Sequence, residues 1–231
     1  MTAGASKYCG FTTLKRYQIP NSESLLYISS GSVTHYAPPD ANKGAIVNAA
    51  NQGCLDGGGV DGAINLAGGK SLMADRKALP VDDKLQSIRC RSGDAKVTGP
   101  GDYGKLKTKY VIHAVGPNYN AFTGDIQKGD DLLRSAYESS LLCAKETKLD
   151  YVAFALLSAG VFRGKKKLRE VLEIGVKAIF DNQAAAEVKE VHLCAFSKHE
   201  GKILVDVANT VFGEKESCSV FEEKESCCTV T

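Results

Sequence analysis

The chain has 231 residues, with 29 Lys and Arg against 27 Asp and Glu, so its formal net charge is only +2. A balance this close does not indicate a nucleic-acid partner, which would require a strongly basic surface. The 43% hydrophobic content is typical of a globular protein. The length suits one domain with tails.

The eight cysteines form no CxxC pair and match no zinc spacing, so we expect no metal site and no cofactor. No charged-then-apolar signal segment opens the sequence, and no apolar run approaches the roughly 18 residues of a membrane span. These patterns predict a reducing, intracellular location, cytoplasmic or nuclear.

The first half of the chain contains few regular patterns. Residues 1–24 are polar and are predicted to form an irregular lead-in. Short apolar runs at 25–28 and 46–47 predict strands. Residues 60–67 are rich in small side chains and predict a short helix packed closely against the glycines before it.

The second half alternates strand and helix patterns. Apolar runs predict strands at 110–115, 151–157 and 188–196, and the first of these stops at Gly116-Pro117. Helical spacing of apolar residues predicts helices over 130–148, 168–179 and 203–211. This alternation predicts an α/β domain with helices on both faces of a sheet.

The last 18 residues have a different composition. Glu214–Cys218 recurs nine positions later as Glu223–Cys227, and neither copy carries a core-forming pattern. Residues 214–231 are therefore predicted to be a disordered, charged tail.

The strongest functional pattern spans residues 44–64. A short apolar run leads into Asn48 and Asn51, then into three consecutive glycines (57–59), and a helical pattern restarts at Val60. Glycines without Cβ atoms let a ligand lie directly against backbone N–H groups. With Asp61 as a nearby carboxylate, this stretch predicts a ligand that carries both phosphate and sugar.

This stretch resembles the first ligand loop of the macro domain, the ADP-ribose-binding module, and particularly its MacroD-type hydrolase branch. Three further regions resemble the family in the same order, namely Ala95–Gly99 with Tyr110–Pro117, Leu157–Phe162, and Val191–Phe196. The resemblance implies a three-layer α/β/α fold with a mixed central sheet. It places the macro domain at 25–213, between the lead-in and the tail.

The resemblance also implies roles in the first loop. Asn51 would hold the hydroxyls of the distal ribose, and Asp61 would orient or deprotonate the attacking water, which makes these two the expected catalytic residues. The remaining ligand contacts expected here are Asn48, Gly57, Gly58, Gly59 and Val60.

A second ligand loop is expected after the strand at 151–157. Free backbone N–H groups at the end of such a strand are well placed to bind a diphosphate. Phe162 would lie against the distal ribose, and Phe196 against adenine. The other expected contacts of this loop are Ser158, Ala159, Gly160 and Val161.

Two departures from the family pattern stand out. Relatives usually carry Asp-Ile after the first strand, where this chain has Ser32-Val33. A neutral hydroxyl binds the adenine amino group more weakly than a carboxylate does, although the Val33 N–H remains available. Arg163 and Lys165 add positive charge beside the second loop, which would favour a more anionic ligand.

Two other features have simpler interpretations. His113 lies on an apolar strand and is predicted to be a hydrogen-bonded core histidine rather than a catalytic one. Cys228 stands at the C-a-a-X spacing that is typical of prenylation sites. The upstream residues are acidic, however, and Thr231 is a poor final residue for prenylation. We expect membrane association only if Cys228 is lipidated.

The expected function is hydrolysis of mono-ADP-ribose from acidic protein side chains, together with deacetylation of O-acetyl-ADP-ribose. The expected partners are ADP-ribose, its derivatives and mono-ADP-ribosylated proteins. Two alternatives stay open, namely an ADP-ribose reader without turnover and a phosphatase acting on ADP-ribose 1″-phosphate.

Overall fold

The computed structural model describes residues 11–213 except 83, 86 and 123, and it is built on one seven-stranded sheet. The strand order is β1-β2-β7-β6-β3-β5-β4. The five inner strands run parallel, while β1 and β4 at the two edges run antiparallel to their neighbours. The strands are β1 (Phe11–Gln18), β2 (Leu25–Gly31), β3 (Gly44–Ala49), β4 (Ala95–Thr98), β5 (Tyr110–Ala114), β6 (Tyr151–Ala155) and β7 (Glu190–Ala195).

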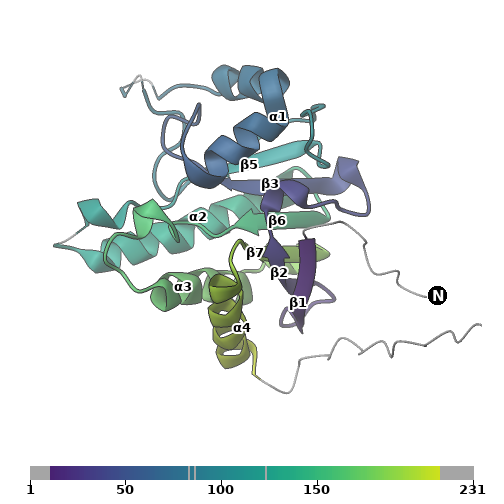
Figure 1. Cartoon of the computed structure of the whole chain (residues 1–231), viewed down its shortest axis with the longest axis vertical. Coiled ribbons are helices and arrows are strands. Elements are labelled where there is room, and N and C mark those ends of the chain that lie inside the picture. Colours follow the sequence, from purple (N-terminus) through teal and green to yellow (C-terminus); the bar gives the residue numbers. More distant parts are fainter. Residues whose placement is uncertain (1–10, 83, 86, 123, 214–231) are drawn as a thin grey trace, which may run out of the picture.

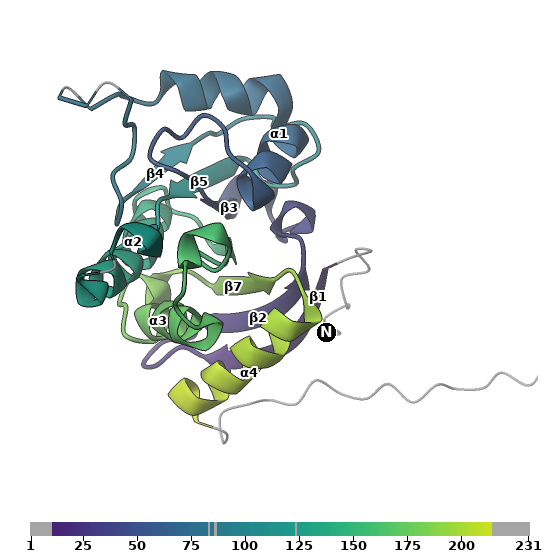
Figure 2. The same ribbon diagram turned by 60° about the vertical axis from the view of Figure 1, so that its left-hand side comes forward.

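Helices cover both faces of this mixed sheet, as the sequence predicts (Figures 1 and 2). The long helices are α1 (Gly59–Ala78), α2 (Ile126–Glu146), α3 (Leu168–Phe180) and α4 (Lys198–Phe212). Side chains alternate between two cores: Ala45 and Val47 of β3 face the core shared with α2, α3 and α4, while Ile46 faces the core shared with α1. The fold is therefore the expected three-layer α/β/α arrangement.

The expected irregular lead-in is wrong for Phe11–Gln18, which forms the edge strand β1. Only one face of this strand is covered by other residues, so its sequence alternates and contains no apolar run from which a strand could be predicted. Tyr17 is its buried anchor, packing against Phe212 and donating a hydrogen bond to Asn209 at 2.8 Å. The domain therefore begins at or before Phe11. The predicted tail, 214–231, lies outside the described residues.

Helix α1 extends well beyond the expected 60–67 because it continues past a kink at Gly68-Gly69. Gly69 has φ 64° and ψ −154°, a backbone region that only glycine enters without strain. The first segment ends near residue 67, where the sequence predicts the end of the helix. A second segment then continues in a new direction. Among the described residues, no helix is both long enough and apolar enough to span a bilayer.

The kink determines which residues of α1 meet. Asp61 and Arg76 are 15 residues apart, which would separate them by about 22 Å along a straight helix. In the structure their side chains are 2.7 Å apart. The second segment of α1 therefore folds back toward the start of the first.

We expect Gly69→Ala to destabilise the protein by about 1–3 kcal/mol, because alanine is strained at a positive φ with this ψ. Urea unfolding measures the change. The matched control is Gly124→Ala, since Gly124 has open space around a Cβ and no positive φ. Equal stabilities for the two variants would show that the kink imposes no special backbone requirement.

Candidate functional site

A continuous cleft lies at the carboxyl ends of the parallel strands, where ligands bind in open α/β sheets. It consists of two adjoining cavities of about 410 and 420 Å³. We call them the Phe196 cavity and the Asp61 cavity, after one residue that lines each. Four residues line both cavities and join them, namely Gly59, Val60, Leu156 and Gly160.

The first loop, between β3 and α1, is glycine-rich because its backbone passes very close to Asp61. A Cβ on Gly57 would lie 2.5 Å from Asp61 Oδ2 and 3.3 Å from the side-chain nitrogen of Asn51. A Cβ on Gly62 would lie 2.8 Å from the Gly57 carbonyl. The glycines thus let loop, helix and carboxylate converge on one point.

Asp61 is buried, with 2% exposure, and its two oxygens have different environments. Oδ1 accepts hydrogen bonds from Arg76 Nη1 at 2.7 Å and from Asn48 Nδ2 at 2.6 Å. Oδ2 has no partner among the described residues and lies toward Gly57 and Asn51. Buried carboxylate oxygens are normally paired, so this one is available to a water or a ligand hydroxyl.

Arg76 holds this carboxylate in place and is itself wholly buried. Its Nε donates to the Cys54 carbonyl at 2.6 Å, and its Nη1 also donates to Asn65 at 2.5 Å. Arg76 therefore ties the second segment of α1 to the first loop as well as to Asp61. Sequence reasoning missed it: the adjacent glycines Gly68-Gly69 indicate where the helix can bend, but not which side chain the bend brings to Asp61.

Asn48 lies beneath the cleft, fully buried, and does not line either cavity. Its Nδ2 donates to Asp61 and also lies 3.2 Å from His113 Nδ1, while His113 Nε2 lies 3.1 Å from Thr98 Oγ1. The Thr98 hydroxyl donates to the Val111 carbonyl, so its oxygen is free to accept from His113. A neutral His113 ring with its proton on Nε2 therefore donates to Thr98 and accepts from Asn48. Asn48 and His113 thus support Asp61 from below.

Asn51 lines the Asp61 cavity, as expected, but its side chain also organises its own loop. Its Nδ2 donates to the Asp56 carbonyl at 2.5 Å, and its Oδ1 accepts from the Gly53 N–H at 3.0 Å. The second amide hydrogen and the second oxygen lone pair remain for a ligand.

The second loop follows β6 and lines both cavities. Ser158 has a left-handed backbone, φ 51°, and its hydroxyl donates to the Pro117 carbonyl at 2.8 Å. Gly116 must lack a Cβ, which would lie 2.3 Å from that hydroxyl oxygen. All the residues expected from this loop line the cleft, namely Ser158, Ala159, Gly160, Val161 and Phe162.

The basic residues of the second loop do not line the cleft. The Arg163 guanidinium folds back, with Nε donating to the Ala159 carbonyl at 3.2 Å and Nη1 to the Lys166 carbonyl at 2.8 Å. Lys165 is exposed. The guanidinium of Arg163 therefore does not form the positively charged rim that was expected beside the second loop.

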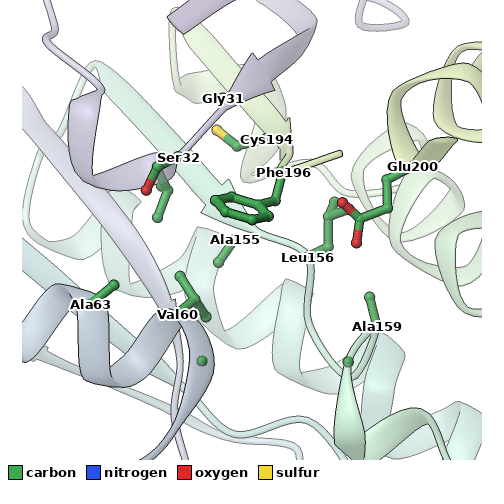
Figure 3. Close-up of a pocket in the computed structure, with 13 residues that line it drawn as sticks. Gly31, Ser32, Val60, Ala63, Ala155, Leu156, Ala159, Cys194, Phe196 and Glu200 are labelled. Carbon is green, nitrogen blue, oxygen red and sulfur yellow. The ribbon is translucent and has the colours of Figure 1, made fainter. Parts of the chain in front are cut away.

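The Phe196 cavity is bordered by Ser32 and by the ring of Phe196 (Figure 3), and Val33 also lines it. Phe196 is 80% exposed, so its face is free to stack on a planar group. The Ser32 hydroxyl already contacts the Thr34 N–H at 3.3 Å and the Thr34 hydroxyl at 2.8 Å. Ser32 thus caps the short 3-10 helix Val33–His35 and keeps only limited capacity for a ligand.

The cleft contains residues that sequence reasoning did not identify. Most are small or apolar and have no chemical signature, but Glu200 is a carboxylate that lines the Phe196 cavity. The unpredicted lining residues are Gly31, Ala49, Ala50, Ala63, Gly116, Ala155, Leu156, Cys194 and Glu200. In the part of the chain that the structure describes, no cluster of His, Cys, Asp and Glu has the arrangement of a metal site.

Comparisons with known proteins identify the family. The model of the macro domain family matches residues 47–174, which is more than half of the chain. A macro domain-containing protein of Caldanaerobacter subterraneus subsp. tengcongensis is 36% identical over 164 residues, covering 71% of this chain and 87% of that protein. The chain therefore belongs to the macro domain family.

Other relatives have more specific names. The ADP-ribose glycohydrolase MACROD2 of Mus musculus is 36% identical over 168 residues, which cover 73% of this chain but only 33% of the mouse protein. The Oceanobacillus iheyensis macrodomain with ADP superposes with a TM-score of 0.73 at 25% identity, covering 89% of this chain and 100% of that one. The Trypanosoma brucei macrodomain in complex with ADP-ribose gives 0.61 at 27% identity, with 83% and 73% covered.

We expect Arg76→Met to cost about 3–5 kcal/mol of stability, because it leaves the Asp61 carboxylate buried without its counter-charge. The double variant Asp61→Asn/Arg76→Met should recover much of that loss, since it removes both charges. Urea unfolding of the two single variants and the double variant measures the coupling. Strictly additive losses would contradict a direct pairing between the two side chains.

Burial, with a smaller contribution from the Arg76 charge, lowers the pKa of His113 to about 3. The unfolded chain has a histidine pKa of about 6.5, so stability should fall as the pH drops from there toward 3. We expect the His113 ring signals in NMR spectra to stay constant between about pH 5 and 8. The urea-unfolded chain is the control, and a titrating ring in the folded protein would contradict the buried chain of hydrogen bonds.

Proposed function

We propose that this protein binds ADP-ribose in the cleft and hydrolyses mono-ADP-ribose from acidic protein side chains, with O-acetyl-ADP-ribose as a second substrate. The observation that carries the proposal is the environment of Asp61. One carboxylate oxygen is held by Arg76 and Asn48, and the other, at the edge of a glycine loop, has no partner in the part of the chain that the structure describes. A carboxylate held in this way is suited to orient a water molecule for attack.

The cleft suits the three parts of ADP-ribose. Adenine stacks on the exposed face of Phe196, beside Ser32 and the Val33 N–H. The diphosphate lies where the two cavities join, against backbone N–H groups of the glycine loop and the second loop. The distal ribose then enters the Asp61 cavity, near Asn51 and Phe162.

In the proposed reaction, Asp61 Oδ2 accepts a hydrogen bond from the attacking water. The water adds to the ester carbonyl or to the anomeric carbon of the distal ribose, the ester bond breaks, and the water's proton passes to the leaving oxygen. The products are a free carboxylic acid and ADP-ribose. Much of the rate enhancement comes from fixing the water and the sugar in place.

The two alternatives differ in how well the cleft supports them. A reader module would use the same contacts without turnover, and only an assay separates it from the enzyme. The phosphatase alternative rests on a positive rim, and the inward-folded Arg163 weakens that basis. Incubation with mono-ADP-ribosylated protein, O-acetyl-ADP-ribose and ADP-ribose 1″-phosphate, with each product followed, distinguishes the three.

We expect Asp61→Asn to lower turnover of mono-ADP-ribosylated protein by at least ~10²-fold, since a positioned group that handles the water's proton contributes that much or more. Binding of ADP-ribose, measured by calorimetry, should persist, because the asparagine oxygen can still accept the hydrogen bonds from Arg76 and Asn48 that hold the glycine loop in place. Asparagine also preserves the shape of the side chain beside Arg76.

Asp56→Asn is the matched control, because Asp56 is an exposed residue of the same loop that does not line the cleft. It should leave both binding and turnover near their original values. Undiminished turnover in the Asp61 variant would contradict the mechanism. Binding of ADP-ribose without measurable turnover in the unsubstituted protein would favour the reader.

A further inference from the structure

Glu200 is the one acidic side chain that lines the Phe196 cavity within the described residues. It belongs to the first turn of α4, and in Figure 3 its carboxylate lies on the Leu156 and Ala159 side of the cavity, across the Phe196 ring from Ser32. It is partly exposed. Glu200 is not among the ligand contacts that the sequence predicts.

Only one of the two carboxylate oxygens of Glu200 is held by hydrogen bonds within the described residues. Its Oε2 accepts from the Ser197 N–H at 2.8 Å and lies 3.1 Å from the Ser197 hydroxyl, as part of a capping box that begins α4. No hydrogen bond to Oε1 is found in the described part of the chain. The helix therefore holds the carboxylate in one place while leaving an oxygen free at the cavity.

The position of Glu200 indicates which part of a ligand it would meet, and this step rests on the proposed function. If the base lies on Phe196 beside Ser32 and the diphosphate lies at the second loop, the sugar that joins them must pass near Leu156 and Ala159. Glu200 borders that same stretch. The ligand group nearest to it is therefore the ribose attached to the base, rather than the base or the phosphates.

We propose that Glu200 accepts hydrogen bonds from the hydroxyls of the adenine-linked ribose and thereby selects ligands in which that ribose is unsubstituted. A carboxylate is well suited to a sugar diol, because it is an acceptor only and a hydroxyl is a donor. The same negative charge repels a phosphate on the 2′-oxygen, a discrimination that acidic residues make in dinucleotide sites. Glu200 is a specificity-determining residue in this proposal and takes no part in bond breaking.

The test compares ADP-ribose with its 2′-phosphate by calorimetry, in the unsubstituted protein and in Glu200→Gln. Glutamine retains the capping box, so α4 should stay intact. We expect ADP-ribose to bind the unsubstituted protein more tightly than the 2′-phosphate, and the substitution to narrow that ratio by about tenfold or more, because like charges in contact are strongly unfavourable. The matched control is Glu170→Gln, since Glu170 forms the capping box of α3 and does not line the cleft.

The outcomes separate this inference from the proposed function. If the unsubstituted protein binds ADP-ribose but Glu200→Gln leaves the ratio unchanged, the inference is wrong and the proposed function stands. If the variant instead changes the preference for ADP-ribose over its inosine analogue, Glu200 contacts the base and the ribose assignment is wrong. If the unsubstituted protein does not bind ADP-ribose at all, both proposals are overturned.

Discussion

The cleft depends on one buried ion pair, between Asp61 at the start of α1 and Arg76 near its end. Removing two charges from water is costly, and the cost is offset only when nearly every polar atom finds a partner. Arg76 has partners for its Nε and Nη1, namely a loop carbonyl, an amide and the carboxylate, whereas its Nη2 has no partner among the described residues. Together with the backbone that Gly69 adopts, this interaction therefore links the bend of the helix, the path of the glycine loop and the orientation of the Asp61 carboxylate.

The rest of the cleft is lined largely by glycines and by small or apolar residues rather than by reactive side chains. Gly57 and Gly62 allow the first loop to approach Asp61, and Gly116 leaves room for the Ser158 hydroxyl, which donates to the Pro117 carbonyl. Backbone N–H groups are fixed by the fold and bind phosphate oxygens without a side chain to order. Specificity must then come from the few side chains at the cleft edge, of which Phe196 and Glu200 are the most distinctive.

The sequence predicts most of the fold, because the buried strands and amphipathic helices carry periodic apolar patterns. It also predicts the two loops that line much of the cleft, since each loop is a contiguous stretch whose glycines and polar residues stand together. It fails where distant residues meet, as with Arg76 and Glu200, and where a polar edge strand such as β1 lacks an apolar run. Asn48 shows a third limit: its residue type indicates a polar role but not whether it contacts ligand or, as here, supports Asp61 from below.

The kink in α1 also limits how this segment can change its length. Each residue added to a helix rotates everything beyond it by about 100° and advances it by about 1.5 Å. A single insertion or deletion between Gly69 and Arg76 would therefore turn the guanidinium away from the carboxylate, even if every other residue were kept. The number of residues between Gly69 and Arg76 is therefore as much a part of the site as the residues themselves.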